Sequence, residues 1–177
     1  GKIGVGGIYE KDVNLAISVK LKKLLEQSGI TVIMTRSDDN GLYNESDTNK
    51  KASDMKKRCS IINESNADAV VSIHQNSYVS GESRGAQVFY YKQSAEGKKL
   101  AGIIQRHIVN EADTTNKRVE KADSTYYLLL HTNVPAVIVE CGFLSNPEEA
   151  GRLNSDSYQQ KIARGIYNGL MEYLTNQ

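Results

Sequence analysis

The chain has 177 residues, of which 39% are hydrophobic and 24% charged, and its formal net charge is +1. These values predict one globular domain with a sizeable core. The near-neutral charge and the lack of a basic run argue against a nucleic-acid binder, and no apolar run is long enough for a transmembrane helix. Cys59 and Cys141 show no CxxC spacing, which argues against a zinc knuckle, and we expect two buried thiols.

The first half of the chain alternates predicted helices and strands. Residues 1–7 are rich in glycine but lack the dinucleotide-binding spacing, so we expect a flexible loop beside a site. The polar residues 37–51 predict a long exposed loop. Apolar residues at helical spacing and short β-branched runs predict the regular elements, which are helices at 9–28 and 52–66 and strands at 30–35 and 69–74.

The second half continues this alternation. A short apolar run at residues 125–130 ends at His131, and a tight connection then leads into a strand at 136–139, so we expect the chain to reverse direction there. Residues 77–84 and 112–124 are polar and predict irregular loops. The remaining elements are a strand at 85–91, helices at 94–111 and 146–153, and a long last helix whose apolar stripe runs from Tyr158 to Leu174. The predicted fold is a single-domain, three-layer α/β/α sandwich with a mostly parallel sheet.

Glu140 ends the most apolar predicted strand. Ala136 to Val139 is a continuous apolar run, as parallel sheets with two covered faces require. Gly142 permits a sharp exit, and Asn146 and Pro147 then suit the start of a helix. Ligands bind at the carboxyl edge of the strands in open α/β sheets, so Glu140 is a candidate site residue. The alternative is a carboxylate that caps a loop or pairs with a surface arginine.

A second strand ends in a functional side chain, because residues 69–74 run into His74. A neutral imidazole is a common metal ligand, although a histidine at a strand end can also be a hydrogen-bonded structural residue. Glu10 begins the helix at 9–28, where the helix dipole favours an anion. A helix that follows a parallel strand begins at that strand's carboxyl edge, so Glu10 is expected at the same edge as His74 and Glu140.

Oxygen and nitrogen donors without thiolates suit a catalytic Zn²⁺ site, which uses three protein ligands and leaves a position for water. A carboxylate that does not bind the metal can act as the general base. With two ligands and one base, a third ligand is missing. His107 lies beside an apolar helix stripe and His131 is expected at the opposite edge of the sheet, so neither is predicted to supply it.

Five segments, at residues 10–17, 32–36, 72–76, 85–91 and 135–146, resemble the zinc-dependent N-acetylmuramoyl-L-alanine amidases of the type-3 class, and most of all the spore-cortex amidases. The resemblance implies that Glu10 and His74 bind Zn²⁺ and that Glu140 is the catalytic carboxylate. It also implies a phosphorylase/hydrolase-like fold and hydrolysis of the amide between muramic acid and L-alanine of the stem peptide.

The chain departs from this family at its start. The family's first strand ends in a His-Gly-Gly segment whose histidine is the remaining zinc ligand, and residues 1–177 form a catalytic domain that begins after it. We expect that histidine, and a signal segment, upstream of Gly1. We also expect residues 1–177 alone to hold zinc poorly. At His131, family members often carry arginine.

The expected partners are peptidoglycan glycan strands and stem peptides, with no nucleic acid. An accessory protein or a dimer partner remains open. The resemblance implies an exported protein of the cell envelope, or of the spore cortex, that acts in sporulation or germination. Two alternatives remain. One is a metal-free peptidoglycan-binding module with a degenerate site, and the other is a zinc carboxypeptidase acting on stem peptides.

Overall fold

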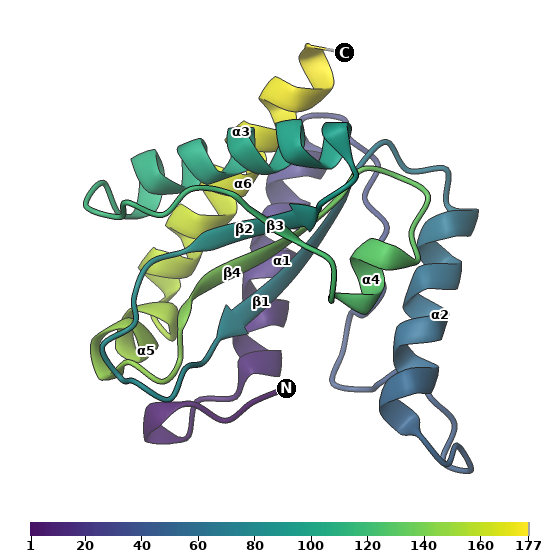
Figure 1. Cartoon of the computed structure of the whole chain (residues 1–177), viewed down its shortest axis with the longest axis horizontal. Coiled ribbons are helices and arrows are strands. Elements are labelled where there is room, and N and C mark those ends of the chain that lie inside the picture. Colours follow the sequence, from purple (N-terminus) through teal and green to yellow (C-terminus); the bar gives the residue numbers. More distant parts are fainter. Residues whose placement is uncertain (177) are drawn as a thin grey trace.

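The computed structural model describes residues 1–176, which form an α/β sandwich (Figure 1). Among these residues no helix is both long and apolar enough to cross a membrane. Both cysteines are free and buried, as predicted. The elements in chain order are η1 Val5–Gly7, α1 Glu10–Gln27, α2 Lys50–Glu64, β1 Val70–Asn76, β2 Gln87–Tyr91, α3 Ala95–Ala112, β3 Lys121–Asp123, α4 Tyr127–Leu130, β4 Ala136–Phe143, α5 Pro147–Leu153 and α6 Asp156–Thr175.

The four strands form one mixed sheet in the order β1-β4-β2-β3. β1 runs parallel to β4 and β2 runs parallel to β3, whereas β2 and β4 are antiparallel. Two of the three pairings are therefore parallel, in agreement with the predicted mostly parallel sheet. The register sets His74 of β1 opposite Glu140 of β4, and Gln87 of β2 opposite Glu140 from the other side.

Two layers of helices cover the sheet. One face packs against α1, α3 and α6 through side chains such as Val137, Val139 and Ile73. The other face carries Ile138 and Phe89, which pack against residues of α2 and α4. Because side chains alternate along a strand, Glu140 and His74 continue this second face. Figure 1 shows α4 on that side of the sheet, with α2 beyond it.

The predicted strand at residues 30–35 is wrong. Ile30 and Val32 do pack against the core, but the segment joins no strand of the part of the chain that the structure describes. Ile33, which alternates with them, is exposed. The alternation of buried and exposed residues is therefore present, as the pattern predicts. A strand also needs a neighbouring strand to pair with, and a local sequence pattern does not show whether one is present.

Two further differences lie before β4. Residues 121–123 form the edge strand β3, although the polar composition of residues 112–124 predicted irregular structure. Within the apolar run at residues 125–130, for which no helix was predicted, Tyr127–Leu130 form the short helix α4. Leu128 and Leu129 bury against α2 and the sheet, so tertiary packing decided the conformation of this run.

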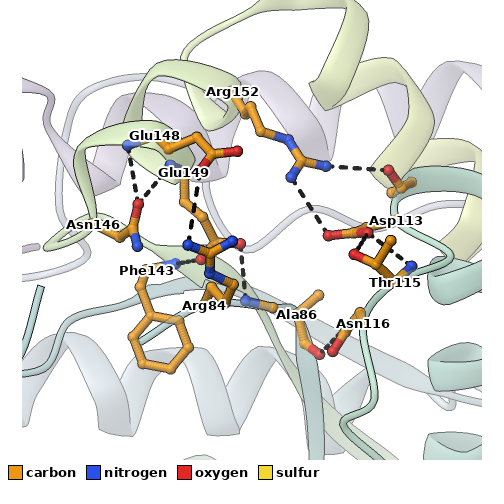
Figure 2. A network of polar contacts seen from close by, with 12 residues as sticks. Arg84, Ala86, Asp113, Thr115, Asn116, Phe143, Asn146, Glu148, Glu149 and Arg152 are labelled. Atoms are coloured by element: carbon orange, nitrogen blue, oxygen red, sulfur yellow. Dashed lines mark hydrogen bonds and ion pairs between the residues drawn. The ribbon is translucent and has the colours of Figure 1, made fainter. Parts of the chain in front are cut away.

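A buried carboxylate fastens the loop that leaves β4. Glu149 of α5 accepts hydrogen bonds from the backbone amides of Phe143 at 2.8 Å and Gly85 at 2.9 Å, and Asn146 caps the same helix by accepting from the amides of Glu148 and Glu149 (Figure 2). Burial raises the pKa of Glu149, and the two amide bonds act in the opposite direction. The segment after β4 and the segment before β2 are thus held together beside Glu140.

Candidate active site

Glu10 and His74 meet at the carboxyl end of β1. The Nδ1 atom of His74 lies 3.1 Å from Oε1 of Glu10, and its Nε2 atom lies 3.1 Å from the Ser72 hydroxyl. Glu10 reaches this position because α1 begins there, and the backbone amide of Lys2 donates to its Oε2 at 2.9 Å. Residues 64 positions apart in the sequence are therefore in direct contact.

The contacts of Glu10 keep its carboxyl group ionised. Burial alone would raise the pKa of Glu10. The opposing effects are larger and lower this pKa to about 2: they are the hydrogen bond with His74, the backbone amides of Lys2 and Gln75, and the charge on His74. The side chain of Glu10 is only 10% exposed, whereas that of His74 is 41% exposed. The site is a buried anion beside an accessible imidazole.

The N-terminal loop packs closely over this edge. The Val5 amide donates to the carbonyl oxygen of Leu144 at 2.9 Å. A Cβ atom at Gly4 would lie 2.6 Å from Cβ of Leu144 and 2.8 Å from its carbonyl oxygen, so only glycine allows this approach. The glycine-rich segment is therefore docked against the end of β4, next to Glu10 and Glu140.

Glu140 is a buried carboxylate next to this pair. It is 7% exposed, and its Oε2 atom makes no hydrogen bond with any described residue. Burial raises its pKa and the nearby Glu10 charge adds to this, whereas His74 and a hydrogen bond from Tyr126 act in the opposite direction. A buried acceptor without a partner is uncommon in a folded protein and calls for an explanation. A carboxylate with a raised pKa suits proton transfer near neutral pH.

Tyr126 is a site residue that the sequence did not reveal. Its hydroxyl donates to Oε1 of Glu140 at 3.0 Å, and burial together with the Glu140 charge raises the pKa of the phenol. Tyr126 lies inside the short apolar run at residues 125–130, where an aromatic residue is ordinary core composition. No local pattern distinguished it from Tyr127, which is exposed.

The amide side chains of Asn14 and Gln75 form a hydrogen-bonded chain that ends at Glu10. Asn14, one turn further along α1, donates to Oε1 of Glu10 at 3.4 Å and accepts from Gln75 at 3.1 Å. Gln75 is 3% exposed, and its own backbone amide lies 3.4 Å from Oε1 of Glu10. This chain restricts the orientations of the Glu10 carboxylate.

The other two histidines lie elsewhere. His107 of α3 is 2.7 Å from a carboxylate oxygen of Glu172 on α6. His131 is exposed, its Nδ1 lies 2.8 Å from the carbonyl oxygen of Tyr127, and its ring stacks on that tyrosine. Neither contacts Glu10 or His74. The chain turns back after His131, as expected, because Tyr126 contacts Glu140 before the turn and β4 returns from Ala136 to Glu140 after it.

The donors present suit zinc in kind but not in number. Two atoms bound to one tetrahedral Zn²⁺ at ~2.0–2.2 Å lie ~3.3–3.6 Å apart, and the Glu10 and His74 donor atoms, at 3.1 Å, are slightly closer than this. Within residues 1–176, however, no group of three or more His, Cys, Asp or Glu side chains is arranged to hold a metal ion. The described residues therefore offer a partial ligand set.

The α/β sandwich brings Glu10, His74 and Glu140 together at one edge of its sheet. The chain belongs to the N-acetylmuramoyl-L-alanine amidase family, whose model matches residues 1–172. It is an N-acetylmuramoyl-L-alanine amidase, as the sequence predicted.

The chain is similar in sequence and structure to several individual amidases. The chain is 37% identical over 180 residues to the germination-specific N-acetylmuramoyl-L-alanine amidase of Bacillus subtilis (strain 168), covering 100% of this chain and 75% of that protein. The CwlD amidase of Clostridioides difficile, solved in complex with the GerS lipoprotein, is 42% identical with a TM-score of 0.96, covering 100% of this chain and 92% of that one. The catalytic domain of the CwlV amidase of Bacillus (Paenibacillus) polymyxa is 30% identical with a TM-score of 0.85, over the same shares.

Proposed function

We propose that the chain cleaves the amide between muramic acid and L-alanine with Glu10 and His74 as zinc ligands and Glu140 as the catalytic carboxylate. The observation that carries this assignment is the contact of Glu10 with His74, whose cross-strand neighbour Glu140 has a buried Oε2 atom with no hydrogen bond among the described residues. Single carboxylates at strand ends are common, whereas two carboxylates and an imidazole gathered at one edge of a sheet are typical of a site.

Each residue has a distinct task in this proposal. Glu10 is held as an anion by Lys2, Gln75 and His74, so it is ready to bind a cation at neutral pH. Glu140 accepts a proton at Oε2, while Tyr126 holds Oε1, and Glu140 then delivers the proton to the nitrogen of the leaving amine. Its raised pKa helps it to hold that proton between the two steps.

Zinc bound there would supply the Lewis acid that polarises the amide carbonyl and lowers the pKa of an attacking water. We propose that a histidine preceding Gly1 completes the ligand set, as the resemblance to the family implies. Two features are consistent with an additional strand. β1 is an edge strand of the sheet, and residues 30–35 have the strand-like apolar pattern but pair with no strand within the described part of the chain.

The setting we propose is the cell envelope of a spore-forming bacterium, with cortex peptidoglycan as the substrate. The similarity to the germination-specific amidase supports it. The similarity to a CwlD amidase solved with a lipoprotein supports a further proposal, that an accessory protein binds this chain too. Both proposals imply export, which agrees with the expected signal segment.

The test of this proposal uses purified muropeptides and the natural protein including the residues before Gly1. Zinc-loaded protein should release intact stem peptides with a new N-terminal alanine, and a chelator should stop the release. Residues 1–177 alone should hold much less zinc per chain than the longer protein. Release of terminal amino acids would indicate a carboxypeptidase instead, and tight stoichiometric zinc in residues 1–177 alone would mean that the ligands are misassigned.

A further inference from the structure

Arg118 is held in a fixed orientation without an acidic partner among the described residues. Its Nε donates to the carbonyl oxygen of Arg84 at 2.7 Å, and its Nη1 donates to Oε1 of Gln87 at 3.2 Å. Its guanidinium carbon lies 4.9 Å from the centre of the Phe143 ring. Within residues 1–176, no hydrogen bond engages Nη2. A positive charge is thus oriented by neutral groups only.

The other arginines show that this arrangement is unusual in the chain. Four of them lie within 4 Å of a carboxylate, namely Arg58, Arg84, Arg106 and Arg152. Both terminal nitrogens of Arg36 donate to backbone carbonyl oxygens. Arg164 lies exposed on α6. Only Arg118 combines a half-buried position, two orienting side-chain bonds and a free terminal nitrogen among the residues described.

Gln87 connects Arg118 to the candidate active site. Gln87 of β2 is the direct cross-strand partner of Glu140 of β4. Opposite residues of an antiparallel pair point to the same face, with strands about 4.8 Å apart. The guanidinium group, which is hydrogen-bonded to Gln87, therefore lies on the same face of the sheet as Glu140. The neighbouring strand β2 and the side chain of Gln87 separate it from the Glu140 carboxylate. Phe143, under the guanidinium, ends the strand that carries Glu140.

The substrate carries a group that such an arginine recognises. In the stem peptide, L-alanine is followed by a D-glutamate that is linked through its side chain, so its α-carboxylate is free. That carboxylate lies about two residues, or roughly 7 Å, from the amide that is cleaved. A guanidinium recognises a carboxylate through paired, charge-assisted hydrogen bonds.

We propose that Arg118 binds the free α-carboxylate of the second stem-peptide residue and makes the enzyme prefer that form over the amidated one. The proposal rests on the assignment of Glu140 to the catalytic position. It adds a substrate-binding residue on the β2 side of the site. The neutral glycan offers no carboxylate at this distance, so the peptide is the part of the substrate that Arg118 would select.

The test measures binding separately from catalysis. Calorimetry on the full-length, zinc-loaded protein would compare two tripeptides that differ only in a carboxylate or a carboxamide at the second residue. We expect the carboxylate form to bind ~10–100-fold more tightly, the size typical of a hydrogen bond to a charged group. Arg118→Gln should bring this ratio close to one, and Arg118→Lys should retain part of it. The matched control Arg164→Gln should leave it unchanged.

Arg118 also has a structural role, since it links the Arg84 backbone to Gln87. The ratio of the two peptide affinities separates this role from recognition of the carboxylate. A merely structural loss would weaken both peptides equally and would overturn the proposal, as would a wild-type ratio near one. kcat/KM for matching muropeptides should show the same loss of preference in Arg118→Gln. If Glu140→Gln cleaved at the normal rate while the binding ratio depended on Arg118, the catalytic assignment would fail and the carboxylate site would stand.

Discussion

The hydroxyl of Tyr126 donates a hydrogen bond of 3.0 Å to Oε1 of Glu140, across 14 positions of sequence. The other carboxylate oxygen of Glu140, Oε2, makes no hydrogen bond among the described residues. The carboxylate is thus held at one oxygen and open at the other, as proton transfer at a fixed position requires. The relationship depends on α4, because the helix begins directly after Tyr126.

Removing the Tyr126 hydroxyl should slow the reaction. In Tyr126→Phe the Oε1 atom of Glu140 loses its hydrogen-bond donor, so neither carboxylate oxygen keeps a hydrogen bond among the described residues. We expect kcat to fall ~10–100-fold with KM little changed, the size of a lost charge-assisted bond. Steady-state kinetics on a defined muropeptide measure this. The matched control is Tyr127→Phe, since Tyr127 is the exposed neighbour. Equal loss in both variants, or an unchanged kcat in Tyr126→Phe, would contradict the assignment.

Replacing Glu140 by glutamine should remove the general base and leave the zinc site intact. The expected loss in rate is ~10²–10⁴-fold, because an amide cannot accept the proton. Zinc per chain, measured by metal analysis, and the far-ultraviolet circular dichroism should match those of the wild type. If Glu140→Gln instead lost its zinc, Glu140 would be a ligand, and near-normal turnover would rule out the catalytic role.

Glu10 and His74 should control the affinity for zinc. Loss of a hydrogen-bonding residue around a metal site already weakens binding ~10–100-fold, so Glu10→Gln and His74→Ala should each cost at least ~100-fold. Competition with a chelator measures this affinity in the protein that carries its natural residues before Gly1. His107→Ala and His131→Ala are the controls and should bind zinc like the wild type. A large loss in either control would point to a different ligand set.

The stability of the metal-free protein should depend on Glu10 in acid. The pKa of Glu10 falls from 4.5 to about 2 on folding, so the unfolded chain binds more protons between these values. The stabilisation is complete above pH ~5 and is lost as the pH falls towards 2, with a total of at most about 3 kcal/mol.

Urea unfolding between pH 7 and pH 3 tests this dependence. The free energy of unfolding of the wild type should fall with pH more steeply than that of Glu10→Gln. Glu45→Gln removes a carboxylate whose side chain is 91% exposed, and it should follow the wild-type curve. Parallel curves for the wild type and Glu10→Gln would show that Glu10 is not selectively stabilised as an anion.

Glu149 should stabilise the loops beside the site. Glu149→Ala leaves the buried amides of Phe143 and Gly85 without an acceptor, and each such group costs ~1–3 kcal/mol. We expect a loss of ~2–4 kcal/mol in the free energy of unfolding. Its neighbour Glu148 has a side chain that is 65% exposed, so Glu148→Ala should change stability by no more than about 0.5 kcal/mol. Similar effects of the two substitutions would contradict this account.

The sequence by itself determined that Glu10, His74 and Glu140 could lie at the same edge of the sheet. The apolar runs before His74 and Glu140 identify two strands, and in parallel strands the carboxyl ends lie at one edge. Glu10 follows the same reasoning, because its helix begins at that edge. Periodicity is a local property, so the helices at residues 10–27, 50–64 and 95–112 agree closely with the predictions. The strand predicted at residues 136–139 also exists, but it continues through Glu140 to Phe143.

Only the tertiary structure decided what these groups touch. Tyr126 reaches Glu140 because the apolar run that contains it packs as a helix against α2 and the sheet, which the composition of the run alone does not specify. Residues 30–35 show the opposite case, since their pattern suits a strand but no described strand pairs with them. Strand pairing and the contacts of Tyr126 and Arg118 join residues that are distant in sequence. Their energies depend on the packing of the whole domain, which no local window contains.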